Sequence, residues 1–543
     1  VPNNLPNIEQ VEPKPTDLKP DLPSDIPPSN TAPILKTPNA GQNANIQCLT
    51  ATTGNESILV KQIEVNGNTI FTEEINTFTK PFLNRKVSFE DLLCLRSQIT
   101  QLYFDSGYIT SGAFITNNQD ISQGKIEIQV VEGDIEKIEI SGLNRLQAGY
   151  VRSRLKRVTD KPLNQRALEE GLQLLQLDPL LERVNAELTV GSSAGRNILK
   201  VSVREAPAFH AGIGFNNYRS PSIGSTQGNV FVSHDNLLGF GDRFSAQYGI
   251  TEGLDIYDIS YTIPWNASDG TIGVRYGNSD STIVEDRFRD FDIDSETEDL
   301  SFSLRQPIVK KPDTEFALGL SLDLRRTQTS LLGEPFSFSL GPENGESKVA
   351  VLRFTQDWVN RSRDRVLAAR SQFSFGLDAF DATINDTGTD GRFFSWLGQF
   401  QWVEQVSPRA LLVSKITTQL TPDSLLPIEQ FGIGGVDTVR GYRQNQLVAD
   451  NGVLFQTEVR LPLTANPETF QLVPFFEIGT VWNNNAPQSD PSTIAGIGLG
   501  ARWAISRNLG LRLDYGIPLI DANNSGNSLH EKGLYFSLQY QPF

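Results

Sequence analysis

The sequence predicts a mainly β protein, in which an antiparallel β-barrel that crosses a membrane follows two small α+β domains. Three observations predict this architecture. After Pro207, apolar and polar residues alternate for more than 330 residues, and before it a mixed unit of strands and helices roughly 75 residues long occurs twice. Nowhere do about 18 apolar residues run together, as a membrane-spanning helix requires. Strands of a barrel cross a membrane without such a run.

Composition excludes several classes of function. The 543 residues carry a formal net charge of -17, so we expect no nucleic acid partner, because phosphates would repel the chain. Two cysteines and three histidines, without a CxxC motif, offer no zinc or haem ligand set, and we expect no metal or other cofactor. The chain starts at Val1 and contains no methionine, which suggests a mature exported protein from an oxidising compartment.

Residues 1–47 are predicted to form a proline-rich, disordered linker. Ten of the thirty prolines precede Ala40, and they are interleaved with Asp, Asn and Lys. Such a stretch lacks the apolar side chains that a core requires. We therefore expect this segment to be extended and mobile.

Two tandem α+β domains are predicted, over residues 48–133 and 134–206. The alternating strand 61–67 is echoed by 136–142, and the closing strands 125–132 and 198–205 both end in a glutamate. Amphipathic helices lie between these strands. In the first domain Ser88 begins an S-x-x-D capping signal, which apolar residues at helical spacing follow: Leu92, Leu95, Ile99 and Leu102.

Residues 207–543 are predicted to form the barrel. Over 316–325, for example, Phe and Leu alternate with small or charged residues, which gives one apolar face and one polar face. The polar stretches 278–295 and 381–391 are predicted to be long loops, and 407–409 a tight turn. A soluble β-sandwich is the alternative. Sandwiches rarely continue for this length, and they seldom place Asp and Arg opposite a leucine face.

The last strand supports the membrane prediction. Leu534, Phe536, Leu538 and Tyr540 share one face, and the chain ends at Phe543. This pattern resembles the C-terminal sorting signal of bacterial outer-membrane barrels. Tyr540 and Phe543 are the aromatic residues that we assign to this signal.

Motifs of enzymes fit the sequence poorly, and no catalytic residue is predicted. Residues 191–195 match the G-x-S-x-G elbow of serine hydrolases, but they join two predicted strands without a nearby histidine, so a hairpin turn is the plainer interpretation. Residues 496–500 superficially suggest a dinucleotide loop, yet no helix follows them, and we interpret them as small residues of a barrel strand. Glu169 and Glu170 are interpreted as solvated helix positions.

Four stretches together resemble one known family. Residues 101–133 resemble its POTRA domain, and 235–243 the opening hairpin of its barrel. Residues 431–442 contain the VRGY motif of its inward-folded sixth loop, and 475–479 resemble the strand that follows. From about Cys48 onward the chain thus resembles the two-partner secretion transporters (TpsB family, haemolysin secretion/activation proteins of the ShlB/FhaC/HecB type) of the outer-membrane assembly factor superfamily.

The resemblance implies a barrel of 16 strands in the bacterial outer membrane, with both POTRA domains in the periplasm. It implies that these domains capture an unfolded secreted exoprotein of the TpsA type, which passes through the barrel to the cell surface. Outer-membrane lipid, and the barrel assembly machinery during biogenesis, would be further partners. An insertase of other barrels is the alternative, and a passive porin is a third. Two POTRA domains and a proline-rich segment favour secretion, and a porin would not need the domains.

A loop motif carries the predicted functional site. Arg440 is flanked by Val439 on one side and by Gly441 and Tyr442 on the other. Gly441 would give the backbone room to turn, and Val439 and Tyr442 would pack against the barrel wall. A known family member also has an N-terminal helix that plugs the barrel, whereas the prolines of this chain disfavour such a helix.

The resemblance also supplies a partner for the arginine. The family's loop arginine meets an acid at the strand position of Glu477, where the family usually has Asp. We therefore predict that Arg440 and Glu477 hold the loop inside the barrel, since an arginine fork can bind a carboxylate through two bonds. Glu458 and Asp514, on other predicted strands, stay open as alternative partners.

Two further predictions concern the small domains. A free sheet edge can pair with any extended chain, so we predict capture of the partner by strand addition along the strand that holds Lys200 and Ser202, with passive spacers as the alternative. Cys48 and Cys94, both in the first domain of an exported chain, are predicted to form a disulfide, with two unpaired buried thiols as the alternative. The bridge would close a loop of about 46 residues and stabilise the domain by roughly 4 kcal/mol.

Overall fold

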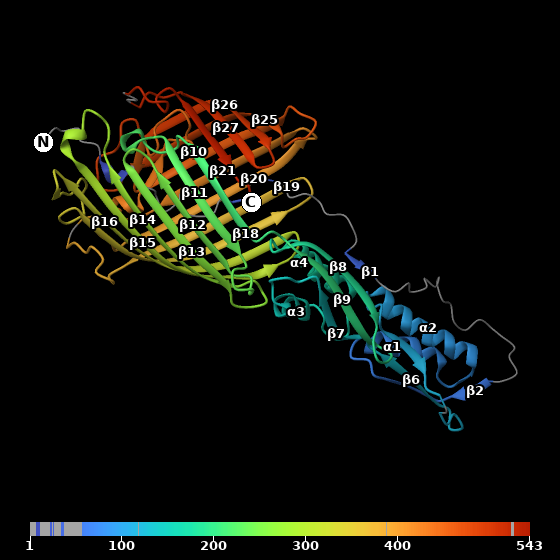
Figure 1. Cartoon of the computed structure of the whole chain (residues 1–543). Coiled ribbons are helices and arrows are strands. Elements are labelled where there is room, and N and C mark those ends of the chain that lie inside the picture. Colours follow the sequence, from blue (N-terminus) through green and yellow to red (C-terminus); the bar gives the residue numbers. More distant parts are fainter. Residues whose placement is uncertain are drawn as a thin grey trace. The chain divides into compact units, whose positions relative to one another are not determined.

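The computed structural model describes residues 7–10, 22–23, 25, 34–36, 57–117, 119–386, 388–522 and 526–543. The chain divides into two compact units (Figure 1). One consists of residues 30–206, and the other of residues 1–29 together with 207–543. Each is described by itself below. No helix in the described ranges has both the length and the apolar character that a bilayer span requires.

The first α+β module combines two α-helices with a three-stranded sheet. Strand β6 lies between β3, to which it is parallel, and the antiparallel β5. The predicted capping box begins α2: the N–H of Asp91 donates to Ser88 Oγ. The elements are β2 (Ser57–Val60), β3 (Gln62–Asn66), α1 (Thr72–Thr79), η2 (Lys80–Phe82), β4 (Arg85–Ser88), α2 (Phe89–Asp105), β5 (Gly112–Ile115) and β6 (Lys125–Val131), with β2 paired to β4.

The second module repeats the three-stranded arrangement. Its last strand β9 lies between β7, which is parallel to it, and the antiparallel β8. The shared order of strands explains why the sequence pattern recurs. The elements are β7 (Asp134–Ser141), α3 (Ala148–Lys156), α4 (Gln165–Gln176), β8 (Leu181–Val190) and β9 (Arg196–Glu205).

The glutamate that ends each repeat binds the turn after the module's first strand. Glu132 accepts the N–H of Thr69 at 2.7 Å and the hydroxyl of Tyr103 at 2.9 Å. Burial alone would raise the pKa of Glu132, but these hydrogen bonds outweigh burial and lower it. Glu205 accepts the N–H of Asn144 at 2.7 Å in the same way. Each module thereby ties its last strand to its first.

Two sequence predictions about these modules, the disulfide and the site of strand addition, have different outcomes. Cys94 lies on α2 and is disulfide-bonded. Cys48 lies outside the described residues, so its pairing with Cys94 stays a prediction. Lys200 and Ser202 lie on β9, which pairs on both sides and is not the free edge that strand addition requires. The alternating pattern identified a strand but not its place in the sheet, since an internal strand uses its backbone groups on both sides.

The larger unit is a closed barrel (Figure 1). Over the described residues sixteen strands form the wall, because β16 pairs directly with β18 while the two-residue β17 lies in the connection between them. Antiparallel pairing of β10 with β28 closes the ring. The strands are β10 (Phe209–Asn216), β11 (Gln227–Asp235), β12 (Arg243–Ile250), β13 (Leu254–Pro264), β14 (Thr271–Thr282), β15 (Ile293–Lys310), β16 (Thr314–Leu331), β17 (Glu334–Pro335), β18 (Glu346–Arg361), β19 (Arg365–Leu377), β20 (Phe394–Ser407), β21 (Ala410–Leu420), β24 (Asn451–Pro462), β25 (Phe470–Trp482), β26 (Thr493–Ser506), β27 (Leu509–Pro518) and β28 (Leu534–Tyr540).

The predicted alternation of faces is present in the wall. On β16, Leu320 is exposed on the outer face, while Asp323 and Arg325 join ion pairs inside the barrel. The predicted turn at 407–409 and the loop at 381–391 lie between strands. The loop predicted over 278–295 is shorter, since β14 continues to Thr282 and β15 begins at Ile293. These ends of β14 and β15 pair with each other, although the side chains on both faces of the two strands are polar.

Candidate functional site in the barrel lumen

The connection between β21 and β24, residues 421–450, folds into the barrel, and we call it the lumen loop. It contains η5 (Pro427–Glu429) and a small hairpin of β22 (Phe431–Ile433) with β23 (Leu447–Ala449). Most of its side chains are buried against the inner faces of the wall strands. The loop therefore occupies space that would otherwise form a channel.

Arg440 is the centre of a buried ion-pair cluster. Its Nε and Nη2 donate to Oε1 of Glu477 at 3.0 and 2.6 Å, and its backbone N–H donates to Oε2 at 2.7 Å. Nη1 donates to Asp514 at 2.7 Å, and Nη2 lies 3.7 Å from Glu458. The guanidinium carbon lies 3.4 Å from the centre of the Phe475 ring. Glu477, Asp514 and Glu458, weighed separately in the sequence, thus surround one arginine together.

Glycines allow the arginine backbone to approach the wall. Gly441 has φ +105°, a conformation that glycine adopts without strain. A Cβ on Gly496 of β26 would lie only 2.2 Å from the carbonyl oxygen of Arg440, and a Cβ on Gly516 of β27 would lie 2.6 Å from the carbonyl carbon. Gly496 therefore makes room for the lumen loop. Residues 496–500 lie within β26 (Thr493–Ser506), as predicted.

The residues that flank Arg440 fix the loop further. Val439 and Tyr442 are fully buried in an apolar cluster with side chains of the wall. The N–H of Gly441 donates to the hydroxyl of Tyr535 on β28 at 2.9 Å, and this hydroxyl donates to the carbonyl of Tyr442 at 2.6 Å. Tyr535 thus satisfies two backbone groups of the motif. Sequence reasoning missed Tyr535, Gly496 and Gly516, because their roles depend on the register of distant strands.

A second buried cluster holds the lumen loop at Glu429, before β22, whereas Arg440 lies between β22 and β23; we call these two points the ends of the loop. Glu429 accepts from Arg353 Nη2 of β18 at 2.7 Å, and Arg353 Nε donates to Asp323 of β16 at 2.6 Å. Arg325, also on β16, pairs with Asp299 and donates to the loop carbonyl of Ile428 at 3.0 Å. The two clusters lie on different sectors of the wall, so the loop is fixed at both ends.

The N-terminal segment, for which the sequence predicts a disordered linker, also contacts the barrel. Ile8 and Glu9 of η1 (Ile8–Gln10) are fully buried, and the segment packs against β15 and η5. Ser339 Oγ donates to Glu9 at 2.5 Å. The described residues differ from the prediction because the barrel supplies the apolar contacts that the segment itself lacks. Ile8 joins a cluster of Ile223, Leu254, Ile283 and Ile293.

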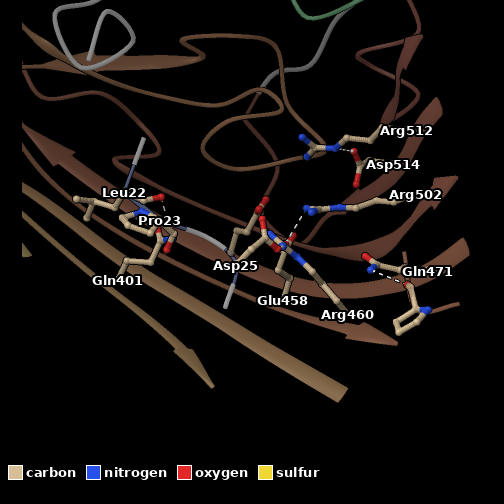
Figure 2. A network of polar contacts seen from close by, with 12 residues as sticks. Leu22, Pro23, Asp25, Gln401, Glu458, Arg460, Gln471, Arg502, Arg512 and Asp514 are labelled. Carbon is tan, nitrogen blue, oxygen red and sulfur yellow. Dashed lines mark hydrogen bonds and ion pairs between the residues drawn. The ribbon is translucent and has the colours of Figure 1, made fainter. Parts of the chain in front are cut away.

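Residues further along this segment bind the wall inside the barrel (Figure 2). Gln401 of β20 donates to the carbonyls of Leu22 and Pro23 at 3.2 and 2.8 Å, and Leu22 is buried. Asp25 pairs with Arg460 of β24 at 2.5 Å. In the described residues before Ser57 the only helix is η1, so the lumen contacts of this segment are made mostly through an irregular backbone.

A cavity of about 810 Å³ lies beside these elements in the lumen. Arginines and acids from β24, β26 and β27 line it, and Figure 2 shows their chain of contacts. Glu458 accepts from Arg460 at 2.9 Å and from Arg502 at 2.8 Å, while Arg512 donates to Asp514 at 2.6 Å. A polar, charged interior with an apolar exterior suits a water-filled channel across a membrane.

Comparison with known proteins identifies the family. The family model described as "Haemolysin secretion/activation protein ShlB/FhaC/HecB" matches residues 195–503. The chain belongs to this family. A second model, the ShlB-type POTRA domain, matches residues 58–133. The resemblance inferred from the sequence is therefore confirmed.

Individual relatives extend the match over most of the chain. The outer membrane transporter CdiB of Dickeya dadantii is 24% identical, over 85% of this chain and 82% of the relative. The hemolysin transporter protein HpmB of Proteus mirabilis is 23% identical, over 75% and 72%. The solved structure of CdiB from Escherichia coli superposes with a TM-score of 0.69 at 22% identity, over 92% of this chain and 94% of that one.

The family assignment fixes the general role of the protein. It is an outer-membrane transporter whose POTRA domains lie in the periplasm, as predicted. Family members are transporters rather than enzymes. Residues 191–195, weighed as a serine elbow, form the turn between β8 and β9, where Ser192 donates to Glu136 at 2.8 Å.

Proposed function

We propose that this transporter exports one unfolded protein partner, a TpsA-type exoprotein, and that the lumen loop and the N-terminal segment close its channel at rest. The observation that carries the proposal is the doubly fixed lumen loop beside a polar cavity. A chain can pass only when both the loop and the segment move. Because the name of HpmB describes a hemolysin transporter, a large secreted effector is the class of partner that we propose.

The ion-pair clusters suit a gate better than a permanent plug. Their charges are satisfied while the loop is docked, and they would be solvated in an open aqueous lumen. The docked loop is therefore stable, yet the free energy needed to undock it is small enough for the channel to open. Folding of the partner outside the cell gives the transport its direction.

The outer surface and the last strand of the barrel indicate the partners that we propose for biogenesis. Apolar side chains such as Phe302 and Leu304 are exposed on the outer face, where lipid would cover them. Tyr540 and Phe543 are likewise exposed, and the Phe543 ring lies 6.0 Å from that of Phe209. We propose that the barrel assembly machinery recognises these two aromatic residues before the barrel closes.

Secretion of a partner encoded beside this protein tests the proposal. We expect the partner in the medium of cells that carry the wild-type chain. Deletion of residues 57–206 should abolish secretion while the barrel still shows heat-modifiable migration on gels. The deletion strain also tests the insertase alternative, because the amounts of its other outer-membrane barrels can be measured. If this strain secretes the partner normally but loses other outer-membrane barrels, the proposal is overturned.

A further inference from the structure

The second POTRA module contains a strongly basic stretch within an acidic chain. Residues 145–166 hold seven basic residues and one acidic residue, Asp160, whereas the whole chain has a formal net charge of -17. We call residues 145–166 the basic segment, and its basic residues are Arg145, Arg152, Arg154, Lys156, Arg157, Lys161 and Arg166. Such a density of positive charge attracts anions that come within a Debye length, roughly 8 Å at physiological salt.

Helix α3 presents much of this charge on its outer side. Val151 and Leu155, one turn apart, are fully buried in the core of the module. Arg152 and Lys156 follow them at the same spacing and are exposed, as is Arg157 at the end of the helix. Among the described residues, no ion pair involves Arg152 or Lys156. The packing of α3 therefore leaves its cations accessible to a partner.

The exposed strands of the same module are charged but nearly balanced. Lys137 of β7 pairs with Glu139 at 2.8 Å, and Arg204 of β9 pairs with Glu182 of β8 at 2.5 Å. Opposite charges on the surface of one sheet offset each other. The excess of positive charge in this module thus belongs to its helical side and not to its sheet.

The first POTRA module provides an internal comparison. Its helix α1 has the same place in the repeat as α3, between the first strand of the sheet and the second helix. Helix α1 carries Glu73 and Glu74 and no basic residue, while α3 carries three basic residues and no acidic one. The two modules share a fold and a compartment, so neither explains the reversal of charge. They differ in their distance along the chain from the barrel.

The basic segment starts at the end of the module that is joined to the barrel. Glu205, the last residue of β9, accepts the N–H groups of Arg145 and Leu146 at 3.1 and 3.0 Å. The first strand of the wall begins at Phe209, so residues 206–208 hold this end within about 14 Å of the wall. Because the wall lies in the bilayer, the membrane surface is within reach of the basic segment.

An exposed apolar side chain lies beside the basic segment. Leu177, which follows α4, is 57% exposed. The next residue, Asp178, accepts from the hydroxyl of Tyr150 on α3 at 2.7 Å, and the guanidinium carbon of Arg154 lies 3.4 Å from the centre of the Tyr150 ring. An apolar and an aromatic residue among arginines are typical of surfaces that lie in the headgroup region of a membrane.

We propose that the basic segment, together with Leu177, binds the anionic phospholipid headgroups of the periplasmic leaflet and holds the second module against the membrane beside the barrel. The phosphates complement the charge of α3, and the short connection to the wall explains why the module next to the barrel has the basic helix. The acidic remainder of the chain opposes this contact only weakly, since charges further away than a Debye length are screened. The inference goes beyond the proposed export and does not depend on it.

The full-length protein, reconstituted in lipid vesicles, tests the contact. Gly149→Cys on α3 carries a fluorophore, because a Cβ there meets nothing within 4 Å and Cys94 is disulfide-bonded. A nitroxide on the lipid headgroups quenches a fluorophore that lies at the membrane surface. We expect stronger quenching in vesicles of phosphatidylcholine mixed with phosphatidylglycerol than in vesicles of phosphatidylcholine alone. The difference should disappear at about 1 M salt, where the Debye length is about 3 Å. Equal quenching in both kinds of vesicle would overturn the proposal.

Charge variants in the mixed vesicles locate the contact on α3. The α3 variant replaces three cations: Arg152→Gln, Lys156→Gln and Arg157→Gln. Each cation near an anionic surface changes binding by about fivefold, so this variant should weaken the docked state by roughly a hundredfold and lower quenching to its value in phosphatidylcholine alone. The matched control removes the same charge from exposed strand positions of the module and should leave quenching unchanged: Lys137→Gln, Arg183→Gln and Arg204→Gln.

An acidic segment of the exported partner is the alternative occupant of this surface. If the α3 variant loses secretion of the partner while its quenching equals that of wild type, the basic segment acts on the partner and the lipid contact is wrong. Heat-modifiable migration on gels verifies that the variant barrels are folded. Quenching that depends on phosphatidylglycerol and on the α3 cations supports the contact even if no partner is exported, so the failure of export and the failure of this inference are distinguishable.

Discussion

The two ends of the lumen loop are both fixed by buried arginines, but with the charges reversed. At one end the loop supplies the cation: Arg440 reaches Glu477 and Asp514 of the wall. At the other end the loop supplies the anion: Glu429 meets the wall residue Arg353. Both ends are almost fully buried.

This difference determines what each end tolerates. Removal of Arg440 would strand the buried Glu477, whose ion pair among the described residues is with Arg440, although Asp514 would keep Arg512. Removal of the Glu429 charge would instead leave Arg353 paired with Asp323. We therefore infer that the Arg440 end docks first and most strongly.

Arg440→Ala should have the largest effect. Loss of one member of a buried ion pair costs about 3–5 kcal/mol, because the other charge is stranded. We expect secretion to be abolished while the barrel still assembles, and Glu477→Ala to mimic it. Secreted partner is measured beside heat-modifiability of the barrel on gels. Normal secretion by both variants would refute the lock, and loss of the folded barrel would make the pair structural.

Arg440→Lys should have a smaller but clear effect. Lysine keeps the charge but cannot bind Glu477 and Asp514 through a planar fork. The loss of one hydrogen bond between charged groups, about 1.5–3 kcal/mol, corresponds to at least a tenfold shift toward the undocked loop. Single-channel recordings should show more frequent openings than in wild type. An unchanged frequency of opening would mean that the positive charge, without the planar fork, is enough to hold this end of the loop.

Glu429→Gln tests the opposite end. Glutamine keeps the shape and can still accept from Arg353, which retains Asp323, so we expect channel opening to increase less than in Arg440→Lys. The measurement is the same recording in the same lipid. An increase in opening larger than that of Arg440→Lys would reverse the inferred order of the two ends.

Asp25→Asn should have the smallest effect. The Asp25 side chain is 74% exposed, and its partner Arg460 also pairs with Glu458. Exposed pairs contribute about 0–1 kcal/mol and weaken with salt. We expect secretion close to wild type and a slight, salt-dependent rise in channel opening. A complete loss of secretion would show that this contact is essential to the pathway.

Individual residues show how much of the site could be predicted from the sequence. The VRGY motif located Arg440, and resemblance to the family pointed to Glu477, since both are local signals. Asp514 and Glu458 were recognised only as competing partners, because strand registers decide that all three acids converge on one guanidinium. Tyr535 gave no signal, since its role exists only when β28 lies beside the lumen loop.

The sequence by itself determined the barrel, the two repeated modules and the family, because alternation, helical spacing and motifs record the local conformation of each segment. Only the tertiary structure decided which strand is an edge and what fills the lumen. Lys200 and Ser202 alternate as an edge strand would, yet β9 pairs on both sides, with β7 and with β8. A proline-rich segment without a core of its own became buried at Ile8 and Leu22, because burial depends on what surrounds a residue and not on its neighbours in sequence.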